Sequence, residues 1–164
     1  MPRLQKRLRS ASLCETSTRV RASPSIGSVF GSQKEFSRVT LENAVIGQEH
    51  LGGLLFGTLQ SSDLKVSSIS ARQLKLEGGL TVPPLDADAT IGSDGAVQSV
   101  KIAGPDRLAG QFTPRNGEIA FEVSAGTFPV PFMAGTTLAD FAMKGNATRL
   151  GMGIAEFHGR SGDG

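Results

Sequence analysis

The sequence predicts a mainly β protein: an antiparallel meander of short strands that forms a curved sheet and need not close, preceded by a disordered basic N-terminal tail. Apolar and polar residues alternate along many short segments, which places them on opposite faces of strands. Turn signals rich in Gly, Asn, Asp and Pro recur at intervals of roughly 8–12 residues. Helix signals are scarce, and 21 glycines with 38% hydrophobic residues fit a thin apolar layer.

The expected tail covers residues 1–35. Residues 1–38 carry 8 of the 17 Lys and Arg but only 2 of the 15 acidic residues, and apolar anchors are few. This composition favours disorder, with a short helix over Leu4 to Leu13 as an alternative. A mitochondrial-type transit peptide has the same composition, so that interpretation stays open. Because the basic charge lies in the tail, a nucleic-acid partner is not favoured.

We expect a β-sheet module over residues 36–164. Val39 and Leu41 alternate with polar residues before a turn at 43–47. The apolar run Leu54 to Leu59 is too short to predict a helix. Between residues 64 and 76 the apolar positions change parity twice, which indicates two bulges or strand breaks that re-aim the apolar face.

Further strands are expected between turn signals along residues 80–106. Pro83-Pro84 ends a strand or confines it to an edge. The alternating segment 85–91 leads to Asp94-Gly95, a hairpin signal. A strand with Val97, Val100 and Ile102 then ends at the turn 104–106.

The strongest turn signal is Asn116-Gly117, since both residues accept positive φ at little steric cost. On the strand that follows, Ile119, Phe121 and Val123 share one face, and Glu118 and Glu122 share the other. The prolines at 129 and 131 predict an edge or irregular strand. Two more short strands are expected, one at 141–145 and one at 152–154.

The sequence predicts no metal, no cofactor and no enzyme. Cys14 is the sole cysteine, and His50 and His158 stand alone, so no zinc site or Cys-His pair has a local signature. Asp86, Asp88 and Asp94 resemble a calcium loop only in outline, because Ile and Val occupy the positions that need Gly and Glu. Glu118 and Glu122 are expected as exposed acids of a two-faced strand.

The ordered residues resemble AsmA-like proteins over roughly residues 36–164. The resemblance lies in the run from Leu138 to Arg149 with its Lys144-Gly145 step, in Met152 to Phe157, and in the strand style of residues 64–78. The chain is similar to a truncated member of that family. The family's N-terminal transmembrane helix is missing, with the basic tail in its place, and the strands stop at Gly164, so we expect the module to be incomplete at its C-terminus.

The resemblance implies an envelope protein of Gram-negative bacteria, periplasmic or associated with the inner membrane, although no targeting signal is visible in this chain. It implies a role in outer-membrane assembly or phospholipid handling, and brings no catalytic residues. Expected partners are lipid or a neighbouring β-sheet, with a membrane contact through the anchor of full-length members.

We therefore expect a non-enzymatic module whose apolar sheet face contacts lipid or a neighbouring sheet. The residues expected to line this face are Phe112, Ile119, Phe121, Val123, Phe128, Val130 and Phe132. The alternative is a structural or interaction module, a β-sandwich or solenoid fragment with a filled core and no ligand. An enzyme with scattered residues is a third class, which a pocket gathering His50 or His158 with two acids would favour.

Overall fold

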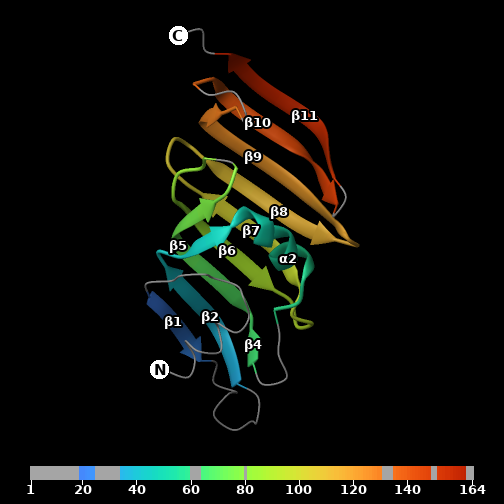
Figure 1. The fold of residues 1–164 in the computed structure, drawn as a ribbon. Helices are drawn as coiled ribbons and strands as arrows, with labels where there is room; N and C mark the ends of the chain where they lie inside the picture. Colours follow the sequence, from blue (N-terminus) through green and yellow to red (C-terminus); the bar gives the residue numbers. More distant parts are fainter. Residues whose placement is uncertain are drawn as a thin grey trace.

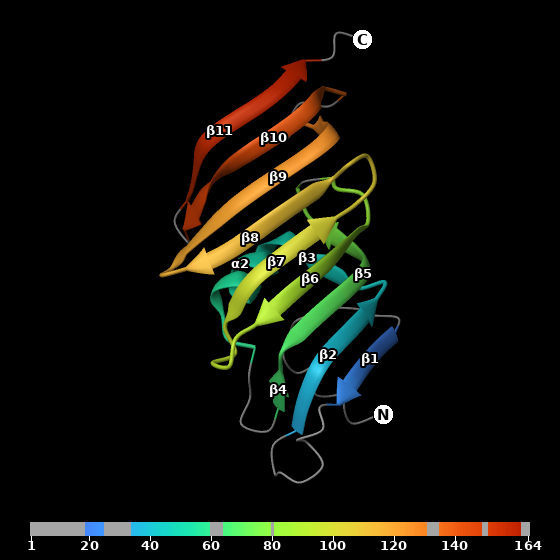
Figure 2. The ribbon, with the colours of Figure 1, turned by 180° about the vertical axis from the view of Figure 1, so that it is seen from behind.

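The computed structural model describes residues 19–24, 34–59, 64–79, 81–130, 135–148 and 151–161. These residues form one open mixed sheet, seen from its two faces in Figures 1 and 2. Its strands are β1 (Arg19–Pro24), β2 (Lys34–Glu42), β3 (Val45–Gly47), β4 (Leu64–Val66), β5 (Ser68–Glu77), β6 (Leu85–Ile91), β7 (Val97–Ala103), β8 (Ala109–Arg115), β9 (Glu118–Pro129), β10 (Thr137–Thr148) and β11 (Met152–Ser161). Two short helices, η2 (Gln48–His50) and α2 (Leu51–Phe56), follow β3.

The main path of the sheet runs β1-β2-β5-β6-β7-β8-β9-β10-β11. From β5 onward every pairing is antiparallel between consecutive strands, so the predicted mainly β, open meander is confirmed. The parallel pairings of β2 with β4 and β5, and of β3 with β5, were not predicted. They arise because the chain crosses over after β2 through β3, η2 and α2.

Strand β1 lies within the stretch for which composition predicts a tail. It pairs antiparallel with β2 from Arg19 opposite Glu42 to Pro24 opposite Phe36. Both arginines of β1 approach the Glu42 carboxylate: Nη1 of Arg19 lies 3.7 Å from Oε2, and Nε of Arg21 lies 3.6 Å from Oε1. A segment with few apolar residues is thus held chiefly by backbone pairing along an existing strand edge.

The predicted turn at Asn116-Gly117 is confirmed. Its two residues have φ of 52° and 81°, and they join Arg115 of β8 directly to Glu118 of β9. Positive φ at both central positions matches the twist of a two-residue hairpin. Gly95 likewise has φ of 79° in the turn between β6 and β7.

Both predicted irregularities between residues 64 and 76 are present. The first is a break at Ser67, which separates β4 from β5. The second is a bulge within β5, where the register with β6 shifts between Ala71 and Leu74 and Gln73 has φ of 54°. Asp86 accepts a hydrogen bond from the Gln73 backbone N–H at 3.0 Å, which satisfies a donor that the bulge removes from the ladder.

Prolines in the sheet occupy places where their strand has one neighbour. Pro129 pairs with Thr137 of β10 beyond the end of the β8–β9 pairing, and Pro114 pairs with Ile119 beyond the end of the β7–β8 pairing. A missing N–H costs least at such positions. The prediction of an edge at Pro129 holds in this local sense, whereas Pro131 lies outside the described residues.

Residues opposite one another in the ladders share a face, and this aligns two apolar rows across the sheet. The first row contains Ala22, Val39, Ile69, Ala89, Val100, Phe112, Phe121, Gly145 and Ile154. The second contains Leu41, Ala71, Ala87, Ile102, Gly110, Val123, Met143 and Phe157.

The residues at the intervening positions of the strands point to the opposite face and form a polar row. This row contains Arg21, Thr40, Ser70, Asp88, Lys101, Gln111, Glu122, Lys144 and Glu156. Because the register keeps the same alternation from strand to strand, one face of the whole sheet is apolar and the other is polar. The sheet is therefore a single layer with two chemically distinct faces.

The apolar face is covered over part of its length by β3, η2 and α2, which we call the cap (residues 45–56). The cap lies in front of the strands in Figure 1 and behind them in Figure 2. β3 is hydrogen-bonded to the second half of β5, and just after α2 Thr58 forms a bridge with Ala96. A core cluster of buried residues extends from β5 and β6 beneath the cap, through the β7–β8 turn, to β9 and β10. It contains Ala44, Ala71, Leu74, Leu85, Leu108, Ala125 and Phe141.

Candidate functional site

The candidate site is the apolar side of β8–β11, which we call the open face. The cap ends over the β6–β8 region, and within the described residues Figures 1 and 2 show no element across β9, β10 and β11 on either side. A sheet face left without a second layer exposes apolar surface to solvent, and such surface is commonly a binding site. The open face is thus the part of the structure best suited to take a hydrophobic partner.

Five of the seven residues expected on this face lie on β8 or β9. Phe112 and Phe121 stand directly opposite each other, and Val123 lies between Gly110 and Met143. Ile119 and Phe121 are 4% and 6% exposed. They therefore form the floor of the open face, while Phe112 and Val123 remain partly exposed.

Phe128 also belongs to the open face, although its sequence parity differs from that of Phe121. Burial switches parity at Ala125 and Gly126, which are adjacent and both buried. The Phe128 ring stacks on Phe141 of β10, with ring centres 4.3 Å apart and an interplanar angle of 13°. Strict alternation along β9 does not reveal this switch.

Of the last two expected residues, Val130 follows the end of β9 and Phe132 lies outside the described residues. Val130 is partly exposed, and its backbone N–H donates to the carbonyl oxygen of Thr136 at 2.9 Å.

The most exposed members of the open face are residues that the sequence did not single out. Ile154 and Phe157 on β11 are 54% and 51% exposed, and they are the exposed large apolar side chains among the described residues. The Phe157 ring packs edge-to-face against the Phe141 ring, with the two ring centres 5.9 Å apart. Ile154 and Phe157 differ in sequence parity, and a bulge at Ala155 brings them onto a common face with Met143. The pairings of β10 with β11 and with β9 connect this face to Phe121.

Glycine in the first apolar row lets the open face bury its aromatic rings without a second layer. A Cβ at Gly145 would lie 2.9 Å from Cζ of Phe121 and 2.1 Å from the carbonyl oxygen of Gly153. The Phe121 ring therefore rests over β10 at a position where any side chain would displace it. This overlap explains how Phe121 is almost fully buried on a face that no other element covers.

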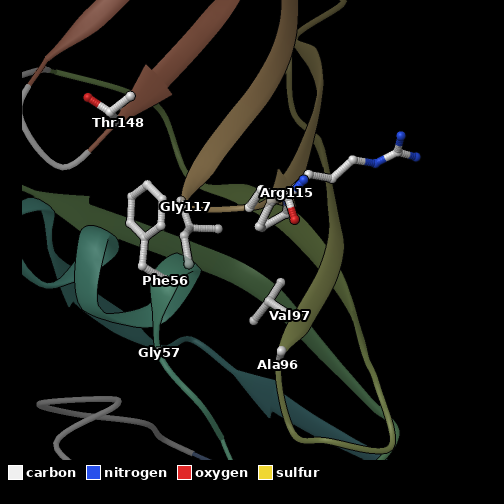
Figure 3. Close-up of a pocket in the computed structure, with 10 residues that line it drawn as sticks. Phe56, Gly57, Ala96, Val97, Arg115, Gly117 and Thr148 are labelled. Carbon is white, nitrogen blue, oxygen red and sulfur yellow. The ribbon is translucent and has the colours of Figure 1, made fainter.

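A pocket of about 520 Å³ lies where the open face meets the cap. Figure 3 shows Phe56 of α2 below the β8–β9 turn, while the Arg115 side chain extends away from the pocket. The pocket is lined by Leu55, Phe56, Gly57, Ala96, Val97, Pro114, Arg115, Asn116, Gly117 and Thr148. Its walls are mostly apolar side chains or backbone, so it extends the apolar surface towards the Asn116-Gly117 turn.

The polar face carries a structural ion-pair cluster on β5 and β6. Arg72 donates to both carboxylate oxygens of Asp88 at 3.0 Å, and the Ser70 hydroxyl donates to Oδ1 at 2.6 Å. The Arg72 hydrogen bonds and, next, that of Ser70 hold the pKa of Asp88 below its usual range. Hydrogen bonds to Asp88 raise the pKa of Arg72 in turn. The predicted role of these aspartates as strand carboxylates fits this placement.

A second cluster surrounds Asp140 at an irregularity of β10. Asp140 has φ of 47°, and the β10–β11 register shifts beside it. Arg160 donates to one carboxylate oxygen and Arg107 donates to the other at 3.0 Å. Arg160 first, and Arg107 second, lower the pKa of this carboxyl group. The cluster ties the β7–β8 turn, β10 and β11 together.

Side chains suited to metal binding or acid–base chemistry do not gather in the described parts of the chain. No group of three or more His, Cys, Asp or Glu side chains there could hold a metal ion. His50 lies in η2, where its Nε2 is 3.5 Å from Oε1 of Glu49. His158 lies on β11, opposite Ala142 of β10. Glu118 and Glu122 are exposed on β9.

Among the described residues no helix has the length and apolar character needed to cross a membrane. Comparisons with known proteins add no relative: no protein-family model, no curated protein and no solved structure matches this chain.

Proposed function

We propose that this protein is a non-enzymatic envelope module of AsmA-like type that holds the acyl chains of a phospholipid on its open face. The observation that carries the proposal is the pair of apolar rows that run across the sheet and emerge uncovered on β9–β11. Acyl chains are long, apolar and without hydrogen-bonding groups, so they match a surface that is extended, apolar and poor in polar side chains.

Exposure and shape both favour an extended apolar ligand. Ile154 and Phe157 are each about half exposed, at 54% and 51%, so covering them removes apolar area from water. The face continues from these residues past Met143 and Val123 towards the pocket at the cap. A chain lying along this path would contact several strands, as expected for a lipid-handling groove.

The envelope location, and a role in outer-membrane assembly or phospholipid transport, come from the resemblance of residues 36–164 to AsmA-like proteins. Fractionation of Gram-negative cells that express the chain tests the location. The proposal expects the protein with the periplasm or inner membrane, and recovery in the cytosol alone contradicts this part of it.

Binding of a fluorescent phospholipid to the purified chain tests the central claim. We expect saturable binding, weakened at least about tenfold by the double variant Ile154→Asp/Phe157→Asp, because each buried large apolar side chain contributes roughly 1.5–3 kcal/mol and about 1.4 kcal/mol equals tenfold. Phe121→Asp should also abolish binding, but a charge at a 6% exposed position should disturb the fold as well.

The matched control is Gln111→Asp, which adds an acid on the polar face of β8, where Gln111 is exposed. It should leave lipid binding unchanged. Circular dichroism on each variant separates lost binding from lost structure. Equal binding by the wild type and the folded double variant, or no binding by the wild type, contradicts lipid binding at the open face.

A second candidate is a structural or interaction module with no ligand. The burial of Ile119, Phe121 and Phe141 to 4–6% exposure favours it, because these side chains are already packed in the free chain. It predicts cooperative unfolding and no uptake of lipid. The lipid-binding measurement therefore distinguishes the two functions.

A further inference from the structure

Among the described residues, strand β11 is an edge strand of the sheet with little protection. It pairs with β10 along Met152–Ser161 and, within the described residues, with no other strand. Edge strands are usually blunted by Pro, by charged side chains, by β-bulges or by short length. β11 has ten residues with no Pro and no Lys, and its protection is one bulge at Ala155 and two charged side chains, Glu156 and Arg160. The opposite edge strand, β1, has six residues, two arginines and Pro24.

We propose that two copies of this chain associate by antiparallel pairing of β11 with β11, about a two-fold axis through His158. A two-fold axis perpendicular to the sheet keeps both apolar faces on the same side and closes the assembly at a dimer. The two open faces would then form one continuous apolar surface. This association is independent of whether the open face binds lipid.

Charges on the polar face complement one another in this register. Positions at equal distance from residue 158 lie opposite each other, so Glu156 faces Arg160 of the second copy, twice. Both side chains are exposed, at 61% and 79%, so they can reach across the new ladder in addition to their pairs within their own chain, which are Glu156 with Lys144 and Arg160 with Asp140. Opposite charges directly across an antiparallel pair stabilise it.

The apolar face is continuous across the axis at the same register, where Phe157 faces Gly159 of the second copy. The place that a Cβ of Gly159 would occupy lies 3.4 Å from Cδ1 of Leu138 and 3.6 Å from Cζ of Phe157 in its own chain. The Phe157 rings and Leu138 side chains of the two copies would therefore meet beside the axis. An aromatic side chain across from an edge glycine is a recognised way to stabilise strand pairing.

Neighbouring registers fit less well. An axis through Glu156 would place two glutamates opposite each other, which is destabilising. The β10–β11 ladder passes from Glu156 directly to Ile154, so Ala155 is a bulge. An axis through Phe157 would therefore place Ile154 opposite Arg160 of the second copy. These two side chains lie on different faces of the sheet, Ile154 on the apolar face and Arg160 on the polar face, so they could not pair. The axis through His158 keeps the bulge outside residues 156–160.

Disulfide trapping tests this register in the full chain. In a Cys14→Ser background, single cysteines replace Glu156, Phe157, His158 or Gly159 in turn, followed by mild oxidation and non-reducing electrophoresis. Only a residue on the axis faces its own copy at the Cα separation of about 4.5–5.5 Å that a disulfide requires. We expect His158→Cys to form the covalent dimer at least about tenfold faster than the other three.

Sedimentation of the native chain from about 5 to about 500 µM supplies the second test, because a strand-edge interface is small and weak. We expect a dimer fraction that rises with concentration. Glu156→Arg and Arg160→Glu should each lower it, and the double reversal should restore it. Dichroism confirms that the variants fold.

Three results overturn the proposal. The first is a monomer at the highest concentration. The second is trapping at residue 157 in preference to 158, or at all four positions equally. The third is a double reversal that stays as monomeric as the single variants while remaining folded.

Discussion

The covered and open halves of the sheet use the same alternation of residues but bury their apolar face in different ways. Over β5–β7, the cap and the segments beside it close on the face and pack Ala44, Leu74 and Leu85 to between 0% and 6% exposure. Over β9–β11, no described element lies on the face. Burial there comes from the Phe121 ring, which lies over Gly145, and from the contacts of Phe141 with the rings of Phe128 and Phe157. Alternation thus decides which face is apolar, and the segment after β2 decides how much of that face stays open.

The largest effect should follow a cavity in the covered half. Leu85 is 2% exposed within the core cluster, so Leu85→Ala should lower the free energy of unfolding by about 2–5 kcal/mol. Ile154→Ala is the comparison in the open half, and we expect it to cost less than about 1 kcal/mol because Ile154 is 54% exposed. Urea unfolding measures both. Equal costs would mean that the open half is covered in solution.

A side chain at Gly145 should be the most damaging small change in the open half. Gly145→Ala forces apart Phe121, β10 and β11, and should cost about 1–3 kcal/mol. The control is Gly153→Ala on β11, where the new methyl group would meet only the Asn146 carbonyl oxygen, at 3.8 Å. If the two variants unfold at the same urea concentration, the ring overlap at Gly145 contributes nothing to stability.

The ion pair of the covered half should make stability fall in acid. Asp88 has a lowered pKa in the folded state, so its contribution is complete above the ordinary aspartate pKa of about 3.9 and is lost as pH falls through the lowered folded value. Because the Asp88 side chain is 54% exposed, screening limits this contribution to about 1 kcal/mol or less.

A double-mutant cycle at pH 7 isolates that ion pair. Asp88→Asn and Arg72→Gln should each destabilise, and the double variant should cost less than the sum of the two. Asp140 on β10 has a pKa lowered in the same direction, chiefly by Arg160, so some acid sensitivity should survive in Asp88→Asn. Strict additivity at pH 7 would show that Arg72 and Asp88 do not interact in solution.

The smallest effect on stability is expected at the rim of the open face. Phe157→Ser should change the free energy of unfolding by about 1 kcal/mol or less, since the ring is 51% exposed. The same variant should weaken phospholipid binding, which separates a functional residue from a structural one. A loss of stability as large as that of Leu85→Ala would place Phe157 in a core instead.

Local patterns in the sequence foretell much of this architecture. Asn116-Gly117 identifies its hairpin because its backbone preference is set by two residues, and the parity changes between 64 and 76 identify a break and a bulge for the same local reason. The parallel pairing of β2 with β5 is different, because it joins segments separated by the whole cap. No local preference encodes which distant strand becomes a neighbour.

The residues of the candidate site also fall into two groups, those that a local pattern predicts and those that depend on strand pairing. Phe112, Phe121 and Val123 follow from a hairpin and its alternation, so the sequence alone identifies them. Phe157 depends on two later strand pairings and on a bulge at Ala155, so its position on the same face emerges only when the registers are laid side by side. Phe128 shares a face with Phe141 because of a parity switch at Ala125 and Gly126, which strict alternation hides.

The consecutive pairing from β5 to β11 has a mechanical consequence. A force applied to the C-terminal end would break the backbone hydrogen bonds between β11 and β10 one after another. It would then detach β10 and β9 in turn, each at low force. β2 and β5 behave otherwise, since they run parallel and the cap lies between them in the chain. Force along their common axis would load the hydrogen bonds of the four paired positions, Val39–Glu42 with Ile69–Arg72, at the same time, so this end of the sheet should resist the force more than β11 does.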